Sequence, residues 1–163
     1  MTLLARAPAL AVPPDGRQSE RALAICTGVR RLLAGRGFAS VTELTLASGR
    51  RADIMAVGPD GCVWIVEVKS SVADFRADGK WPDYAEYCDA FCFGVALGFP
   101  TEILPQEPGL IVADGFGASL LRDPPEHKLA AARRKAVLLR FAHAAANRHH
   151  ALVDPAGARG WMD

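Results

Sequence analysis

The chain has 163 residues, a length that fits one domain with a substantial hydrophobic core. Half of its residues are hydrophobic and 23% are charged, which excludes an intrinsically disordered chain. The net charge of +1 singles out no partner, but residues 122–163 hold 8 basic and 4 acidic groups, either for phosphate contacts or as a solvated helical face.

The N-terminal residues 1–18 are predicted to be a flexible leader before a single domain at 19–150 and a C-terminal tail at 151–163. The leader has no basic start, and Arg6 interrupts its short apolar run, so it does not fit a signal peptide. No apolar stretch is long enough to cross a bilayer, and we expect a cytoplasmic protein without membrane contact. The four cysteines and four histidines lack metal-ligand spacing, so zinc is not expected.

A first helix is predicted from an N-cap at Ser19 to about Leu33, because apolar residues recur at helical spacing. A strand is then expected at 41–46. If the chain turns near Ser48, Glu43 of this strand lies opposite Asp53.

Two apolar strands are predicted at 52–57 and 62–68, joined by a turn of Gly, Pro and Asp residues. A turn centred on Asp60 puts Asp53 opposite Glu67, and alternation sends both to the same face as Lys69. Like charges directly opposite each other destabilise a sheet. We therefore expect a cation between the two carboxylates.

The remaining elements complete a sheet covered by helices. A polar helix start follows Lys69, breaks at Gly79 and restarts at Trp81-Pro82. The strand at 91–97 is expected to run parallel to an earlier strand, because a helix connects them. A second hairpin at 110–121 and a long alanine-rich helix from Lys128 to about Asn147 follow. The sequence predicts an α/β protein with a central mixed sheet flanked by helices.

The acidic pattern resembles that of a known enzyme superfamily. Asp53, then thirteen residues, then Glu67-Val68-Lys69 is similar to the motif of PD-(D/E)XK nucleases, with Ala52 where a proline is usual. The stretch VKSSVADFRADGKWPDYAEYCDAF resembles the MmcB-like family of DNA repair proteins. This resemblance covers about 27–104, and more loosely the rest.

The resemblance implies a restriction-endonuclease-like core and a metal-dependent deoxyribonuclease that hydrolyses phosphodiester bonds in DNA repair. It implies that Asp53 and Glu67, with the carbonyl of Val68, hold Mg²⁺ or Mn²⁺, and that Lys69 activates or positions the attacking water. Glu43 is a candidate third metal ligand or a solvated strand residue, and both interpretations stay open. Basic residues near the motif are expected to contact DNA: Arg50, Arg51, Arg76 and Lys80.

Two alternatives remain at this point. Asp53 and Lys69 could form an ordinary cross-strand ion pair, or the chain could be a non-catalytic module that binds nucleic acid or protein. The chain shows no obvious second domain to grip a substrate, so a homodimer or a partner protein that supplies specificity is expected on either interpretation.

Overall fold

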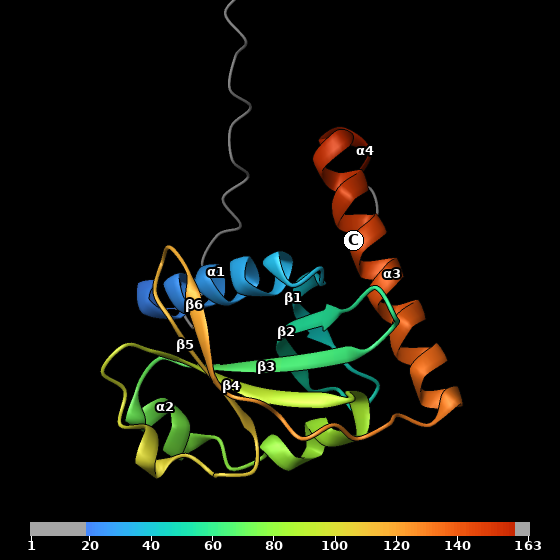
Figure 1. The fold of residues 1–163 in the computed structure, drawn as a ribbon. Helices are drawn as coiled ribbons and strands as arrows, with labels where there is room; N and C mark the ends of the chain where they lie inside the picture. Colours follow the sequence, from blue (N-terminus) through green and yellow to red (C-terminus); the bar gives the residue numbers. More distant parts are fainter. Residues whose placement is uncertain (1–18, 159–163) are drawn as a thin grey trace, which may run out of the picture.

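The computed structural model describes residues 19–158, so the predicted leader and the end of the predicted tail, with Trp161, lie outside the described residues. Figure 1 shows the elements in chain order. They are α1 (Glu20–Gly35), β1 (Ala39–Thr45), β2 (Arg51–Val57), β3 (Val63–Lys69), α2 (Val72–Ala77), the 3₁₀ helix η1 (Trp81–Tyr87), β4 (Ala90–Ala96), the 3₁₀ helix η2 (Thr101–Ile103), β5 (Gly109–Ala113), β6 (Ala118–Arg122), α3 (Ala131–Val153) and α4 (Pro155–Ala158).

The strands form one six-stranded mixed sheet in the order β1-β2-β3-β4-β5-β6. The first three strands are antiparallel, β3, β4 and β5 are parallel neighbours, and β6 returns antiparallel to β5. The predicted α/β class and the parallel pairing of the fourth strand are therefore confirmed. β1 and β6 are the two edges of the sheet.

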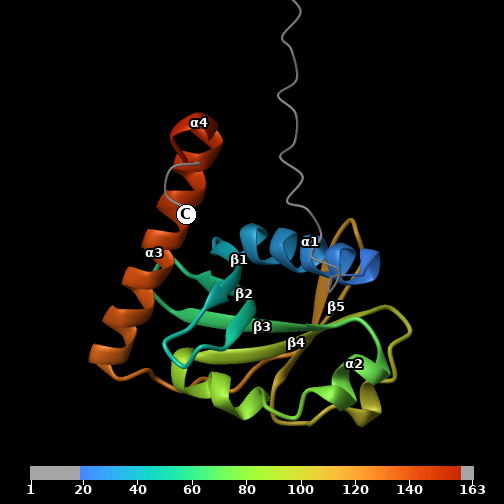
Figure 2. The same ribbon diagram turned by 180° about the vertical axis from the view of Figure 1, so that it is seen from behind.

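Helices cover both faces of the sheet (Figures 1 and 2). Helix α1 packs on one face, where Ile25, Val29 and Leu33 meet the apolar residues of the central strands. Its N-cap is Ser19, as predicted, whose hydroxyl accepts a hydrogen bond from the Ala22 amide. The layer of α1 lies across the sheet from η1 and α3.

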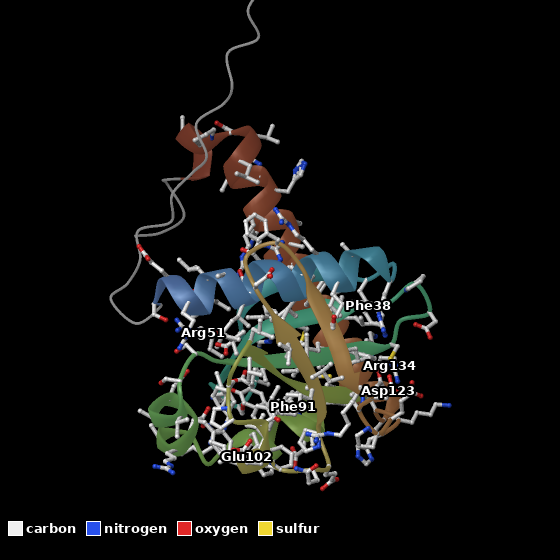
Figure 3. The ribbon with its side chains drawn as sticks, turned by 60° about the vertical axis from the view of Figure 1, so that its left-hand side comes forward. Phe38, Arg51, Phe91, Glu102, Asp123 and Arg134 are labelled. Carbon is white, nitrogen blue, oxygen red and sulfur yellow. The ribbon has the colours of Figure 1, made fainter. Side chains whose placement is uncertain are left out.

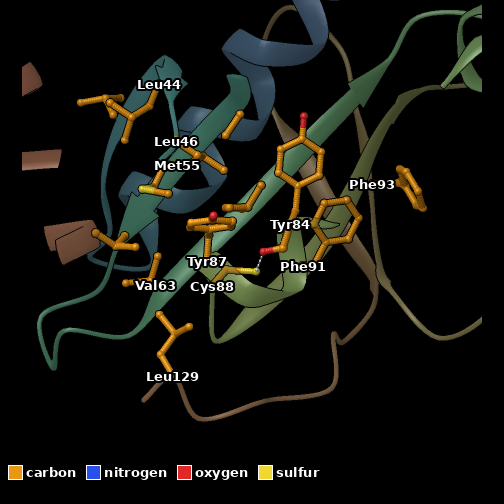
Figure 4. Packing of buried hydrophobic residues seen from close by; sticks show 14 of the residues in the cluster. Leu44, Leu46, Met55, Val63, Tyr84, Tyr87, Cys88, Phe91, Phe93 and Leu129 are labelled. Carbon is orange, nitrogen blue, oxygen red and sulfur yellow. Dashed lines mark hydrogen bonds between the residues drawn. The ribbon is translucent and has the colours of Figure 1, made fainter. Parts of the chain in front are cut away.

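The opposite face holds the larger core cluster, which η1 and α3 close (Figure 4). Tyr84 and Tyr87 of η1 are both buried, and Tyr84 stacks on Phe91 with ring centroids 5.9 Å apart. Cys88 donates a hydrogen bond from its Sγ to the Tyr84 carbonyl. A 3₁₀ helix repeats every three residues, so tyrosines three apart point to the same side. Tyr87 is therefore part of the core.

Helix α3 begins at Ala131, later than the predicted start at Lys128, and it continues to Val153. The later start follows from contacts that hold the preceding segment extended. The Leu129 amide donates to the Asp89 carboxylate at 2.9 Å, and the His127 amide donates to the Asp89 carbonyl at 2.7 Å. No helix among the described residues is both long and apolar enough to cross a membrane.

Candidate active site

The backbone pairing between β2 and β3 stops just before the two predicted acids, Asp53 and Glu67. Val57 pairs with Val63 and Met55 pairs with Ile65, which is the register that a turn centred on Asp60 predicts. The paired residues end at Ile54 and Val66.

Beyond that pair, carboxylate side chains replace backbone carbonyls as the acceptors of hydrogen bonds between the two strands. The Asp53 amide donates to Glu67 Oε1 at 3.2 Å, and the Val68 amide donates to Asp53 Oδ2 at 2.8 Å. Each carboxylate thus satisfies an amide of the neighbouring strand. The two acids therefore lie side by side and are fixed by the sheet itself.

Strand β1 is also irregular at this level. Glu43 lies between the pairs Thr42–Ile54 and Leu44–Ala52, which places it across from Asp53 as predicted. Its φ of 50° is left-handed, a conformation uncommon for a residue with a side chain. Such strain costs on the order of 1–3 kcal/mol and is concentrated at functional sites. The Glu43 carboxylate pairs with Arg51 at 3.5 Å.

These residues line a cleft of about 480 Å³ at the end of β3, between the first half of α1 and the segment of α2 and η1. All of the predicted catalytic and metal-binding residues lie in its wall. The cleft is lined by Ser19, Ala22, Cys26, Glu43, Arg51, Asp53, Glu67, Val68, Lys69, Ser70, Asp74, Asp78 and Tyr84.

Lys69 is almost fully buried in this cleft, with a side chain 4% exposed. Its Nζ lies 2.7 Å from Asp78 Oδ2 and 3.9 Å from Glu67 Oε2. Burial alone lowers the pKa of a lysine, but the hydrogen bond to Asp78 and the charges of Glu67, Asp78 and Asp74 outweigh it and raise the Lys69 pKa. Lys69 is thus a fixed, charged ammonium beside the two acids.

Asp78 and Asp74 were not predicted to belong to the site. The six-residue helix α2, capped by Ser71, turns the chain back so that Asp78 at its end reaches Lys69. Asp74 accepts hydrogen bonds from the amide and hydroxyl of Ser70. A lone acid nine residues after the motif gives no periodic signal, and only the short length of α2 could have pointed to Asp78.

Burial shapes the electrostatics of Asp53 and Glu67. Glu67 is 3% exposed, and burial, with the charge of Asp53, raises its pKa to about 8. Burial also raises the pKa of Asp53, against the lowering effects of the Val68 amide and Lys69. Two carboxyl groups so placed repel each other when both are ionised. The site favours either a proton or a cation between them.

The donor set fits a small divalent cation. Two carboxylates and the carbonyl of Val68 are hard oxygen ligands, and Mg²⁺ commonly binds one or two carboxylates while keeping several waters. Within residues 19–158, no third His, Cys, Asp or Glu side chain completes a metal-binding group with Asp53 and Glu67. The role of Glu43 as a third ligand stays a prediction.

The four basic residues predicted to contact DNA are distributed unevenly. Arg51 is exposed in the cleft wall, near the first turns of α1 and at the opposite end of the sheet from Arg134 (Figure 3). Arg50 forms an ion pair with Asp83, with its guanidinium nitrogen 2.6 Å from Asp83 Oδ2. Arg76 and Lys80 are exposed on the segment that follows β3.

Tyr84 is a cleft residue that the sequence did not single out. Its hydroxyl donates to the Arg51 carbonyl at 3.1 Å, and its ring is buried under the cleft. Burial, with the charges of Glu67, Asp53 and Asp78, raises the Tyr84 pKa, so the phenol stays protonated. Tyr84 therefore connects the cleft floor to the start of β2.

Comparisons with known proteins agree with this architecture. A family model described as "DNA repair protein MmcB-like" matches residues 10–156. The chain is similar to a solved structure from Silicibacter pomeroyi, the SPO1766 protein of unknown function, with 46% identity and a TM-score of 0.83. That match covers 86% of this chain and 96% of the other. No functionally curated protein is significantly similar to the chain.

Proposed function

The chain belongs to the MmcB-like family, and from that premise we propose that it is a metal-dependent nuclease that hydrolyses phosphodiester bonds in DNA during repair. The family description names a DNA repair protein, which indicates a role connected with DNA. The observation that carries the proposal is the pairing of half-buried Asp53 with buried Glu67, beside the ammonium of Lys69, in one cleft.

The acids would hold Mg²⁺ or Mn²⁺. Asp53 and Glu67 supply carboxylate oxygens, and Val68 supplies its backbone carbonyl. When bound, such an ion lowers the pKa of a coordinated water and stabilises negative charge on phosphate oxygens. Hydrogen bonds from the backbone amides of Asp53 and Val68 hold the two carboxylates in place before an ion binds. Ion binding therefore requires little rearrangement of these side chains.

Lys69 would orient the attacking water or hold negative charge on the phosphate. The hydrogen bond to Asp78 restrains its Nζ, so Asp78 acts as a positioning residue in this proposal. Removing a preorganised group of this kind lowers the rate by about 10²–10³, equivalent to roughly 3–4 kcal/mol.

We further propose that the sheet and its helices are a restriction-endonuclease-like core. The mixed sheet, with the acidic residues at the end of an antiparallel β2–β3 pair and a parallel strand beyond it, supports this assignment. Fold alone does not determine activity, so the assignment stands on the cleft residues.

The test is incubation of the purified protein with single-stranded, duplex and branched DNA in the presence of Mg²⁺, Mn²⁺ or EDTA. We expect cleavage only with metal. Lys69→Ala should lower the cleavage rate by about 10²–10³ with little change in metal affinity, because an ammonium is not a ligand. Lys128→Ala, at an exposed lysine away from the cleft, should cleave normally.

Cleavage by Lys69→Ala at the wild-type rate would end the catalytic assignment. No cleavage of any DNA by the wild-type protein would favour the second candidate function, a non-catalytic binding module. One observation favours that candidate: Lys69 Nζ is closer to Asp78 than to Glu67, so part of its charge serves a structural ion pair.

A further inference from the structure

The edge strand β1 is flanked by arginines from both helical layers. Arg30 of α1 donates its Nε to the Ser40 hydroxyl at 3.2 Å. From α3, Arg140 donates to the Thr45 carbonyl at 3.2 Å and Arg148 to the Glu43 carbonyl at 3.4 Å. Figures 1 and 2 show β1 lying between α1 and α3.

The charges of these arginines are not neutralised by acids. In residues 19–158, Arg30, Arg140 and Arg148 form no ion pair, and their hydrogen-bond partners are a hydroxyl and two carbonyls. Other arginines of the same helix differ: Arg133 pairs with Glu86, and Arg134 pairs with Asp89. All three residues beside β1 are exposed, so each keeps N–H donors and a full positive charge for another molecule.

The positive edge adjoins the acidic cleft. Glu43, whose carbonyl accepts from Arg148, also lines the cleft, and Arg51 beside it is exposed in the cleft wall. The charge of Arg30 acts on Cys26, another cleft residue, and opposes the raising effect of burial on its pKa. A chain of phosphates could therefore follow β1 and enter the cleft without a gap in positive charge.

We propose that this β1 edge, formed by Arg30, Arg51, Arg140 and Arg148, is the surface that binds the sugar–phosphate backbone of a DNA strand. The proposal rests on the proposed action on DNA and specifies where the substrate lies. From Ser40 to Thr45 the strand spans about 17 Å at roughly 3.3 Å per residue. Measured along the axis of a DNA duplex, that length corresponds to about five base pairs at about 3.4 Å per step.

The edge also explains how an acidic cleft can accept a polyanion. Five carboxyl groups line the cleft, and they repel phosphate unless neighbouring cations attract it. Guanidinium groups bind phosphate oxygens through two parallel N–H donors, which suits them to this task. Arg140 and Arg148 are eight residues apart on one helix, just over two turns, and both reach backbone carbonyls of β1.

The test measures DNA binding in EDTA, so that its outcome does not depend on cleavage. Fluorescence anisotropy with a labelled single strand and a labelled duplex, titrated at several salt concentrations, gives the affinity and its salt dependence. The test variant is Arg140→Gln/Arg148→Gln. The control is Arg31→Gln/Lys135→Gln, which removes the same amount of charge at exposed positions of α1 and α3 away from β1; Arg31, like the tested arginines, donates to backbone carbonyls.

We expect the test variant to bind more weakly than the control and to flatten the slope of log affinity against log salt. Two lost phosphate contacts should lower that slope by about 1.8 for the duplex or about 1.4 for the single strand. Arg140→Lys/Arg148→Lys retains both charges and should keep the slope, which separates phosphate binding from a loss of folding. Thermal melting of each variant accompanies the titrations.

Equal losses in the test and control variants would overturn the proposal, as would a wild-type protein that binds neither DNA at low salt. Binding through the edge without cleavage in Mg²⁺ would refute the proposed hydrolysis and leave the edge standing. Cleavage that is unchanged by Arg140→Gln/Arg148→Gln, with unchanged affinity, would leave hydrolysis standing and refute the edge.

Discussion

At the scale of single residues, Glu67 is the group whose ionisation the fold opposes most clearly. Its carboxyl group is 3% exposed, lies beside Asp53, and has a pKa raised to about 8. In the unfolded chain the same group ionises near pH 4.5. Without metal, the folded protein therefore holds a proton that the unfolded chain releases over that interval.

We predict that the metal-free protein loses stability as pH rises from about 4.5 to 8, and that Glu67→Gln removes part of this loss. The contribution of Glu67 is fully present below pH 4.5 and disappears as pH passes about 8. For one group the slope is at most about 1.4 kcal/mol per pH unit. Glutamine keeps an oxygen that can accept from the Asp53 amide but never ionises, so its profile should be flatter.

Urea unfolding in EDTA at several pH values measures this difference. Glu102→Gln is the control, because Glu102 is an exposed acid away from the cleft (Figure 3). If the free energies of unfolding of Glu67→Gln and the wild type change in parallel between pH 4.5 and 8, Glu67 ionises in the folded protein as easily as in the unfolded chain. Burial would then not raise the Glu67 pKa.

The placement of the two acids could be predicted from sequence because turn chemistry and strand alternation determine which residues face each other. Two features of the same cleft could not. The left-handed φ of Glu43 has no sequence signal, since glycine is the residue that normally signals it. The contact of Asp78 with Lys69 depends on where a six-residue helix ends, and helix ends are decided by tertiary packing.

At the scale of elements, α1 packs tightly against the turn between β5 and β6 at Gly28. A Cβ atom at this position would overlap the carbonyl oxygens of Asp114 and Gly117 in the turn between β5 and β6. The turn is itself held by the Asp114 carboxylate, which accepts from two amides. Neither partner is a flexible side chain, so the helix would have to move.

We predict that Gly28→Ala lowers the free energy of unfolding by about 1–3 kcal/mol, the usual cost of overpacking. Gly35→Ala, on the same helix with no atom within 4 Å of the added Cβ, should instead be neutral or stabilise by up to about 1 kcal/mol. Chemical unfolding of both variants measures the contrast. Equal effects would mean that the close approach of α1 to the turn contributes nothing to stability.

Most elements could be predicted from apolar periodicity and from glycine and proline positions, including α1 with its Ser19 cap. The late start of α3 could not, because it depends on Asp89, a residue forty positions before Leu129 in the sequence. Nor did the sequence show that Arg140 and Arg148 would meet β1. A helix pattern defines which residues share a side, but not which strand that side faces.

At the scale of the whole molecule, the cleft is a place where a bound ion would stabilise the entire fold. Asp53 and Glu67 repel each other whenever both are ionised in the metal-free protein, and a ligand that binds only the folded state stabilises it by mass action. The parallel pairing of β4 and β5 shapes the sheet beyond the cleft, although the connecting segment 97–108 contains only a single short 3₁₀ helix. The parallel pairing of β4 with β5 could not be predicted from the sequence, because parallel neighbours are usually connected by a longer helix.

We predict that Mg²⁺ or Mn²⁺ raises the melting temperature of the DNA-free protein, and more at pH 8 than at pH 6, because Glu67 must lose its proton to bind the ion. At a concentration one hundred times the Kd, the gain is about 2.7 kcal/mol. This corresponds to roughly 5–10 °C for a chain of this size. Differential scanning fluorimetry measures it, with EDTA to reverse the effect.

Asp53→Asn and Glu67→Gln should each reduce this shift strongly, whereas Glu102→Gln should preserve it. An equal shift in all of these variants would place the ion elsewhere on the protein. A wild-type protein that does not respond at either pH would mean that the cleft does not bind divalent ions at the concentrations used.

The exchange of backbone for side-chain partners at the end of the β2–β3 ladder gives the protein two built-in spectroscopic probes. The amide protons of Asp53 and Val68 point at carboxylate oxygens, so their resonance frequencies depend on the charge those oxygens carry. Deprotonation of Glu67, or capture of an ion, would move both signals in an ¹⁵N-labelled sample without any attached dye. The sheet can thus report on its own chemistry from two peptide groups.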